Sequence, residues 1–385
     1  MLGIYYKPRK ELKFNANAQN LMSDTRTSAL NSQSKAAIAL LESLIACRSF
    51  SKEEQGTADL IAQHLQSAGV EVHRHGHNVW ATSKNPDPSK PNLLLNSHHD
   101  TVKPHAQWTS DPFQPLWEED RLIGLGANDA GASLVCLIQS FLAFYDAKEL
   151  AFNLVLAASA EEEISGPNGI ESLLKQADFP RIDCAIVGEP TQMQVAQAEK
   201  GLLVIDALVK GKAGHAAREE GINAIALAME DIQFLHQQPF ERVSPLLGPM
   251  KCSVTIIQAG SQHNVVPDEC RYTIDCRVND CYRLEEVMAF LQDKLHAELI
   301  PRSLRLPSSH IEDTHALIQT AKALALPCFG SPTLSDQALM PFPSIKMGPG
   351  HSGRSHTAGE YILASEIEAG LMGYQTFLTT LNTLI

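Results

Sequence analysis

The chain has 385 residues, which at roughly 150 residues per domain predicts two domains and allows three. Hydrophobic residues make up 44% and charged residues 19%, the balance of a globular protein with enough apolar side chains for a core. The formal net charge is −13, from 31 Lys and Arg against 44 Asp and Glu. This sign argues against nucleic-acid binding, which needs clustered basic residues.

Cysteine usage and apolar stretches bear on where the protein works. The eight cysteines include no C-x-x-C pair and several lie in apolar runs, so we expect reduced and mostly buried thiols. The N-terminal stretch MLGIYYKPRKELKF has basic residues without a following apolar region, unlike a secretory signal. The longest apolar stretch, Leu134 to Tyr145, is too short to span a bilayer. We therefore expect a cytoplasmic protein with no membrane partner.

The first half of the chain alternates strands with helices. Residues 1–33 carry no sustained periodicity and predict a flexible extension, whereas residues 34–50 and Gln55 to Ser67 have helical spacing. The next predicted elements alternate in type: strand Asn92–Asn96, helix Ala132–Tyr145, strand Phe152–Ala158, helix Gly169–Gln176 and strand Cys184–Val187. These strands are apolar throughout, which is typical of a largely parallel sheet buried on both faces in an α/β domain.

The pattern changes near Gly201. The following predicted elements are strand Leu202–Val209, helix Ile222–His236, strands Lys251–Gln258 and Glu269–Val278, and helix Leu284–Glu298. This block is small enough to be an insertion, because strand and helix alternate again after Leu306. We predict an α/β catalytic domain, residues 34–204 and 306–385, with a mostly parallel mixed sheet flanked by helices. We predict that an inserted, smaller α+β domain occupies residues 205–305.

His98 and Asp100 directly follow the first predicted strand of the catalytic domain, in the sequence Ser97-His98-His99-Asp100. In extended backbone these two side chains point to the same face, and ligands gather at strand ends in α/β sheets. A metal-bound histidine usually donates its other ring N–H to a carboxylate, which Asp100 is placed to accept. Taken alone, the pair does not specify a metal site.

Four further motifs carry chemistry, and each has a plainer alternative. Asp129 in IGLGANDAGASL is equally a helix cap, and Glu161-Glu162-Glu163 after FNLVLAASA is equally an exposed acidic turn. Glu189 follows the strand CAIV as a turn residue would, and His356 in GPGHSGRSHTAGE is equally a loop histidine. Together the five motifs supply two histidines and three carboxylates at strand ends, the ligand set that suits zinc.

In their order and spacing these motifs resemble those of the metallopeptidase-related amidohydrolases, which include acetylornithine deacetylase, succinyl-diaminopimelate desuccinylase, carboxypeptidase G-type enzymes and aminoacylases. The resemblance covers nearly all of the chain from Ser34 onward. It implies two zinc ions, with cobalt as the alternative metal. It also implies five ligands: His98 and Glu189 for the first ion, Glu163 and His356 for the second, and Asp129 bridging both.

The same resemblance implies two catalytic roles. Asp100 orients His98, and Glu162 is the general base that takes a proton from the attacking water and passes it to the leaving amine. Because Glu161 stands where relatives usually have Asp, the assignment of the glutamate pair is ambiguous by one residue.

The resemblance extends to the insert, residues 205–305, which it implies is a lid or dimerisation domain. His215 in GKAGHAA matches a loop whose histidine reaches the active site, often that of a partner subunit, although a surface histidine is the plainer alternative. Asn264 in HNVVPDE and Arg277 in DCRV match positions that bind the substrate's carboxylate, and Arg277 is equally an internal ion pair. The resemblance also implies a homodimer, with Leu202–Val209 as an edge strand that pairs across a two-fold axis.

Three functions compete. The wording SHHDTVKP and GANDAGAS is most similar to acetylornithine deacetylase relatives, which favours hydrolysis of a small N-acyl amino acid. The substrates expected on that basis are N-acetyl- or N-succinyl-ornithine or -citrulline, in arginine biosynthesis. A dipeptidase or carboxypeptidase would use the same ligands. A non-catalytic binding protein is disfavoured, because a degenerate relative is expected to lose Glu162 or a ligand and none is missing.

Overall fold

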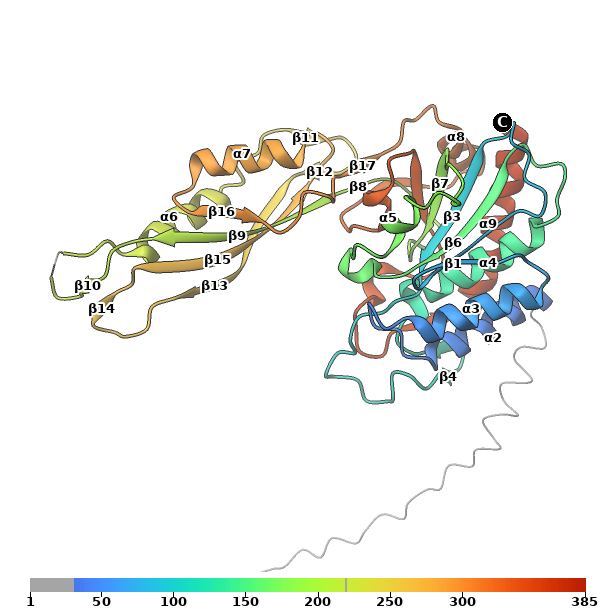
Figure 1. Ribbon diagram of the computed structural model, residues 1–385, viewed down its shortest axis with the longest axis horizontal. Coiled ribbons are helices and arrows are strands. Elements are labelled where there is room, and N and C mark those ends of the chain that lie inside the picture. Colours follow the sequence, from blue (N-terminus) through green and yellow to red (C-terminus); the bar gives the residue numbers. More distant parts are fainter. Residues whose placement is uncertain (1–30, 219) are drawn as a thin grey trace, which may run out of the picture.

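The computed structural model describes residues 31–218 and 220–385, which form two domains (Figure 1). Nearly all of the predicted N-terminal extension lies outside the described residues. The first described residue, Asn31, caps helix α2 (Ser32–Ile45), and its side-chain oxygen accepts a hydrogen bond from the Ser34 backbone N–H at 2.8 Å.

The larger domain is built on one nine-stranded sheet. Its strands in spatial order are β1 (His73–His75), β2 (Asn78–Thr82), β6 (Asn153–Ser159), β3 (Asn92–His98), β7 (Cys184–Gly188), β19 (Ser344–Met347), β8 (Val195–Glu199) and β17 (Ser309–His310), with β18 (Cys328–Ser331) also paired to β8. The central strands β6, β3, β7 and β19 run parallel to one another, and antiparallel strands flank them.

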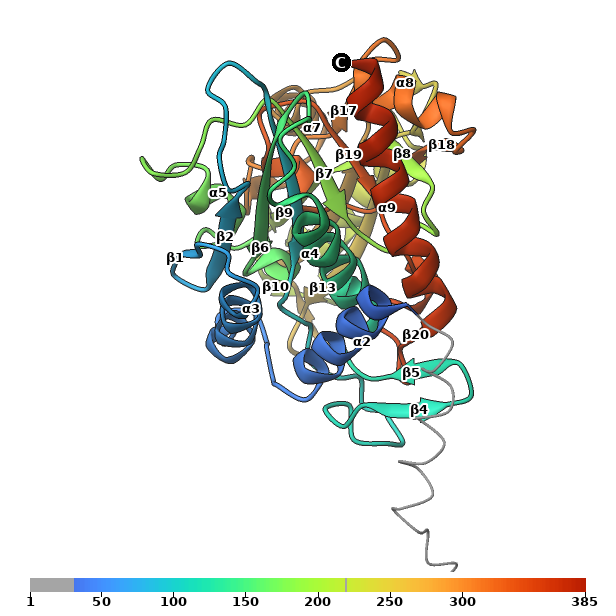
Figure 2. The ribbon, with the colours of Figure 1, turned by 90° about the vertical axis from the view of Figure 1, so that its right-hand side faces the viewer.

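Helices cover both faces of this sheet. Five helices share one apolar core with it: α2, α3 (Gln55–Ser67), α4 (Ala132–Phe144), α8 (Ala316–Ala323) and α9 (Ala364–Leu384) (Figure 2). The short helix α5 (Ile170–Leu173) packs in a second core on the opposite face. Along β3, Leu93 and Leu95 enter the first core and Leu94 the second. Burial on both sides therefore explains why β3 is apolar at consecutive positions.

The loops that carry the candidate site residues lie at the carboxyl ends of the central strands. The parallel strands β3, β6 and β7 end at His98, Ser159 and Gly188. Short helical turns lie beside these ends: η1 (Ala127–Gly131), η2 (Glu162–Ile164), η3 (Asp336–Leu339) and η4 (Ser352–Arg354). A small sheet of β4 (Leu116–Glu118), β5 (Arg121–Ile123) and β20 (Tyr361–Leu363) is also present.

The smaller domain extends away from the larger one (Figure 1). Its four-stranded antiparallel sheet has the order β13 (Lys251–Ala259), β15 (Glu269–Val278), β9 (Gly201–Lys210), β16 (Glu298–Pro301). Helices α6 (Ala224–His236) and α7 (Leu284–Lys294) pack on it, and β11 (Val243–Ser244) pairs with β12 (Gly248–Pro249). Strand β9 alternates buried and half-buried residues, because only one face of this sheet is covered.

The connection between the domains is close-packed at Gly201, where β9 begins. A side chain there would meet the backbone of residues 306–308, in the segment that returns to the larger domain, at 2.5–2.7 Å. Glycine is therefore required by the close approach of the two connecting segments.

The predicted fold class is confirmed: a mixed sheet with a parallel centre and flanking helices, plus a separate antiparallel sheet. Two details are wrong. Strand Leu202–Val209 is not an edge, because β9 pairs with both β15 and β16. The edge strands of this sheet among the described residues are β16 and β13, and Ile256 and Ile257 on β13 are half exposed. Helix α7 ends at Lys294, because the chain turns extended at Leu295 to form β16.

One helical segment, Ala127–Phe144, is long and apolar enough by composition to cross a membrane. Within the fold 78% of this segment is buried. This is expected for a helix that is apolar on all sides and lies in the core of a domain.

Candidate metal centre

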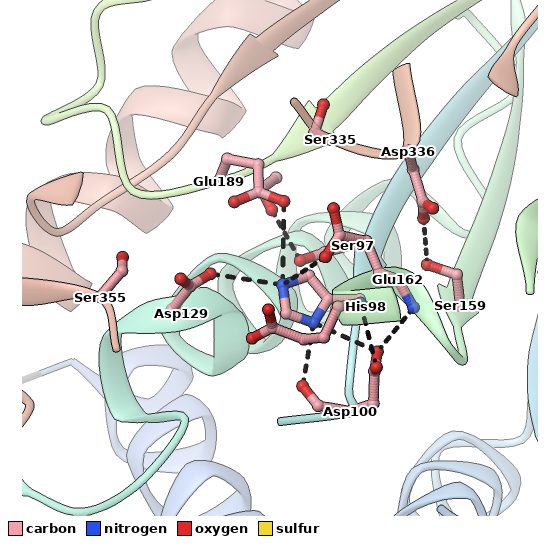
Figure 3. Close-up of polar contacts among 12 residues, drawn as sticks. Ser97, His98, Asp100, Asp129, Ser159, Glu162, Glu189, Ser335, Asp336 and Ser355 are labelled. Atoms are coloured by element: carbon pink, nitrogen blue, oxygen red, sulfur yellow. Dashed lines mark hydrogen bonds and ion pairs between the residues drawn. The ribbon is translucent and has the colours of Figure 1, made fainter. Parts of the chain in front are cut away.

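His98 ends strand β3 at the centre of the polar cluster (Figure 3). Its Nδ1 lies 3.0 Å from the backbone oxygen of Asp100 and 3.5 Å from the Asp100 carboxylate. This contact directs Nε2 toward the other carboxylates, with Asp129 at 3.4 Å and Glu189 at 3.8 Å. The side chain of His98 is therefore held by one nitrogen and presents the other, as in metal-ligating histidines.

Asp129 presents its two oxygens to two different histidines. Oδ1 lies 3.4 Å from His98 Nε2, and Oδ2 lies 3.5 Å from His356 Nε2. The loop that carries Asp129 turns sharply at Gly126, whose φ is +77° and where a side chain would meet Thr101 at 2.7 Å. Asp129 thus faces both histidines and is not the N-cap of the following helix, which begins after Gly131.

The three adjacent glutamates diverge because the chain makes a left-handed turn at Glu161, whose φ is 55°. The Glu161 carboxylate turns to Asn168, accepting its side-chain N–H at 2.9 Å. The Glu162 carboxylate lies 4.0 Å from His98 Nε2, and the Glu163 carboxylate lies 2.9 Å from His356 Nε2. Glu162 and Glu163 therefore face the cluster and Glu161 does not.

Asp100 holds both the His98 side chain and the turn that carries the glutamates. Its carboxylate accepts the backbone N–H groups of Glu162 at 3.0 Å and Glu163 at 3.2 Å, and the Ser51 hydroxyl at 2.7 Å. One buried carboxylate thus sets the position of both glutamates relative to the histidine.

Two clusters of potential ligands result, each with ligand atoms within 4.8 Å of one another. The first contains His98, Asp129 and Glu189, and the second contains Asp129, Glu163 and His356. Each offers one imidazole and two carboxylates, and the sharing of Asp129 joins them. This donor set fits two zinc ions, and the same donors suit cobalt.

Electrostatics shows how crowded the carboxylates are. Burial, together with the nearby charges of Glu189, Asp336 and Glu163, holds the pKa of Glu162 well above its usual range. Burial raises the pKa of Glu189 to about 8. The hydrogen bond from His356 to Glu163 raises the pKa of His356 to about 9. Cations at this place would offset the repulsion and keep the carboxylates ionised.

Comparison with known proteins identifies the family. The model of peptidase family M20/M25/M40 matches residues 94–380. The chain belongs to this family.

Relatives within and around the family differ in what they act on. A succinyl-diaminopimelate desuccinylase of Methylibium petroleiphilum is 30% identical over 288 residues, 68% of this chain and 72% of that protein. An acetylornithine deacetylase of Myxococcus xanthus is 31% identical over 229 residues, 55% of each protein. Among solved structures, a tripeptidase of Staphylococcus aureus has a TM-score of 0.74 at 19% identity, covering 91% of this chain and 99% of that one. That level of identity shows the shared fold alone.

Two of the insert residues singled out from the sequence lie far from these clusters. His215 and Asn264 adjoin each other where β10 (Gly214–His215) pairs with β14 (Val265–Val266), and the Ala216 N–H donates to the Asn264 backbone oxygen at 3.0 Å. This pairing forms the tip of the insert farthest from the catalytic domain (Figure 1). Both side chains are exposed. Within one chain, the structure does not bring them to the M20-family site.

Arg277 forms an internal ion pair, which was the alternative to a role in substrate binding. Its guanidinium binds Asp275 through two hydrogen bonds, at 2.8 and 3.1 Å. It lies opposite Leu202, near the connection between the domains, and not at the insert tip with Asn264. A role in binding substrate stays a prediction for this residue.

Sequence reasoning missed two buried carboxylates near the centre. Asp336 accepts hydrogen bonds from Asn96 at 2.8 Å and from Ser159 at 2.6 Å, and burial raises its pKa to about 6 (Figure 3). Glu360 lies beneath the Asp129 loop, and burial raises its pKa to about 8. Glu360 stands four residues after His356 in the same motif, which was the available signal, whereas Asp336 has no comparable signal.

Proposed function

We propose that this M20-family hydrolase cleaves the amide bond of an N-acyl amino acid and releases a carboxylate and the free amine. The leading substrates are N-acetyl- or N-succinyl-ornithine or -citrulline, as an arginine-biosynthetic enzyme would use. The observation that carries a hydrolytic role is the pair of clusters sharing Asp129, with Glu162 beside them. The acyl-amino-acid substrate is supported by the desuccinylase and deacetylase names of relatives at about 30% identity.

Two metal ions, when bound, would acidify a water and polarise the acyl carbonyl. His98, Glu189, Asp129, Glu163 and His356 are the residues that would hold them. Glu162 is the chain's proton carrier in this proposal: it takes a proton during attack on the carbonyl and gives it to the leaving amine.

A peptidase is the second candidate. It is favoured by the fold shared with the Staphylococcus aureus tripeptidase. It is also favoured by a TM-score of 0.68, at 17% identity, to a dinuclear metal-binding peptidase of the M20 family from Bacillus subtilis, over 92% of this chain and 99% of that one. The chemistry at the scissile amide is the same in both candidates, so substrate turnover must separate them.

The test is an assay of purified protein after chelation and again after addition of zinc or cobalt. The panel contains N-acetyl- and N-succinyl-ornithine, the two citrulline counterparts, and a set of di- and tripeptides. We expect activity to vanish on chelation, to return near two metals per chain, and to be highest on one acyl amino acid. Preferential turnover of peptides would replace the deacylase proposal with the peptidase. No metal and no turnover would leave a binding protein.

We further propose a homodimer in which β13 of one insert pairs with that of a second copy. This strand is an edge of its sheet among the described residues and exposes Ile256 and Ile257, each at about half of its surface. Unpaired edges with apolar side chains are prone to pair with another chain. Sedimentation of Ile256→Lys should show a monomer where the wild type is a dimer, and a monomeric wild type would refute the arrangement.

A further inference from the structure

Glu360 is a buried carboxylate that contacts the backbone of the loop carrying Asp129. It is 1% exposed, and its Oε1 accepts the N–H groups of Asn128 at 2.8 Å and Asp129 at 2.9 Å. Its Oε2 accepts the Gly126 N–H at 3.2 Å. Three backbone N–H groups converge on this one buried side chain, so it restrains the loop at Gly126, Asn128 and Asp129.

The same residue also ties down the segment that carries His356. Glu360 follows His356 by four residues and directly precedes β20, which pairs with β5. Its backbone oxygen accepts the Gly124 N–H at 3.1 Å, just after β5. Asp129 and His356, whose facing atoms lie 3.5 Å apart, therefore reside on two segments joined by Glu360.

We propose that Glu360 is a positioning residue for the second metal site, formed by Asp129, Glu163 and His356. It touches neither ligand side chain directly and acts by fixing the backbone from which Asp129 and His356 project. The inference rests on the metal centre invoked in the proposed function, and it adds a residue that sets how tightly one of the two ions is held. Supporting groups of this kind typically change metal affinity by about 10–100-fold.

The experiment measures zinc binding and not turnover. Wild type, Glu360→Gln and Glu360→Ala are stripped with chelator, titrated with zinc by calorimetry, and analysed for bound metal after dialysis. We expect two ions in the wild type and one tightly held ion in Glu360→Ala, with the second about 10–100-fold weaker. Glu360→Gln should be intermediate, because an amide keeps one acceptor oxygen and places an N–H₂ group against the Gly126 N–H.

Asp231 provides a matched control in the insert. It is also 1% exposed, and it accepts the His296 and Ala297 N–H groups at 2.8 and 3.1 Å and the Tyr272 hydroxyl at 2.8 Å. Asp231→Ala should lower thermal stability but keep two zinc ions. Equal metal loss in both alanine variants, or two ions of wild-type affinity in Glu360→Ala, would overturn the inference. A wild type without two ions would overturn it together with the metal centre, whereas two ions without turnover would refute only the proposed substrate.

A second inference concerns Cys252 and Cys276, which lie opposite each other on β13 and β15. Their sulfur atoms are 2.9 Å apart and both residues are buried. Directly opposed residues of antiparallel strands have Cα atoms about 4.5–5.5 Å apart, within the range that disulfides use. We infer that this pair is an oxidation site that closes a disulfide between the edge strand and its neighbour.

The reaction requires a two-electron oxidant, for which a peroxide suffices. Each thiol gives up one proton and one electron, the S–S bond forms, and hydrogen peroxide is reduced to two waters. Because peroxide can also reach the four half-buried cysteines, thiol counting in denaturant is read as a difference: after treatment the wild type should lose two more thiols than Cys252→Ser. Peptide mapping should find Cys252 linked to Cys276, and a reductant should reverse both changes.

The matched variants are Cys252→Ser and Cys281→Ser, the latter being a half-buried cysteine on the same domain. The linked peptide should disappear in the first variant and persist in the second. Eight thiols remaining after oxidation, or a linked peptide that joins other cysteines, would refute this inference.

Discussion

The sequence predicts functional residues in two regions: at the carboxyl ends of the strands in the catalytic domain and at the tip of the insert. The two regions differ in how deeply these residues are buried. His98 and Asp100 are almost wholly buried, and each makes several polar contacts. His215 and Asn264 are exposed on a two-residue strand pair. Buried polar groups must form hydrogen bonds within the protein, whereas exposed polar groups can bind water or a partner molecule. The polar groups of the first region are therefore paired within the chain, whereas the side chains of the second face solvent.

The largest expected effect is at the residue that the two ligand clusters share. Asp129→Ala should remove a ligand from both sites, so bound metal should fall below one ion per chain and activity to background. Metal analysis by mass spectrometry after dialysis gives the measurement. Asp146→Ala, which breaks an exposed ion pair with Lys84, is the control and should keep both ions. Two tightly bound ions in Asp129→Ala would show that the clusters are not the metal centre.

Substitution of the proposed base should separate chemistry from metal binding. Glu162→Gln keeps the size of the side chain and the Asp100 hydrogen bond to its backbone N–H, so two metals should remain. The turnover number kcat should fall by about 10²–10⁴-fold with little change in KM, the range expected for loss of a general base. Steady-state kinetics on the best substrate of the panel gives the answer. Loss of metal in this variant would reassign Glu162 as a ligand.

A subunit-mixing experiment tests whether the insert tip completes a partner's site. His215→Ala alone should be poorly active. Mixing it with inactive Asp129→Ala should restore about a quarter of wild-type activity, because half of the randomly formed dimers contain one intact site out of two. No restoration would mean that His215 acts within its own chain, after a large movement of the insert, or does not act at all.

The smallest expected effect is a pH dependence of stability from His99, next to the site. Its Nδ1 lies 2.8 Å from the Thr57 hydroxyl and its Nε2 lies 3.1 Å from the His77 backbone oxygen. Burial lowers its pKa to about 4. At pH values between the ordinary histidine pKa of about 6.5 and about 4, His99 is protonated in the unfolded chain but not in the folded chain. Unfolding free energy should therefore decline by up to about 3 kcal/mol as pH falls from about 6.5 to about 4.

Urea unfolding of metal-free protein at several pH values measures this decline. His99→Gln removes the titrating group, so its stability should depend less steeply on pH over the same range. An identical slope in the two proteins would assign the acid sensitivity to other groups.

How far the sequence predicts the fold follows from how each segment is buried. The strands around His98 and Glu189 are apolar on both faces, so their positions and the parallel sheet could be read directly. The sequence alone does not identify the edge strands of the insert sheet, because β9 and β13 are both apolar and the pairing order leaves no local signal. Strand β8, with its Gln197 and Glu199, was missed because it buries polar side chains.

The candidate site shows the same division. The residue types at strand ends gave the ligand set, but which glutamate of the acidic run faces the cluster depends on a left-handed turn at Glu161. The role of Arg277 does not follow from the sequence. Its partner Asp275 is two residues away, and that spacing alone does not show whether the two side chains form an ion pair. Asp336 reaches the centre through contacts 177 and 240 residues distant in sequence. Such contacts exist only once the fold has formed.

Asp100 carries a consequence for how this site can evolve. The same side chain restrains His98 and receives the N–H groups of both Glu162 and Glu163. A substitution there would disturb His98, Glu162 and Glu163 at once, which are the ligand proposed for one ion, the proposed proton carrier and the ligand proposed for the other ion. If these three residues act as proposed, Asp100 should tolerate substitution poorly whatever the substrate is.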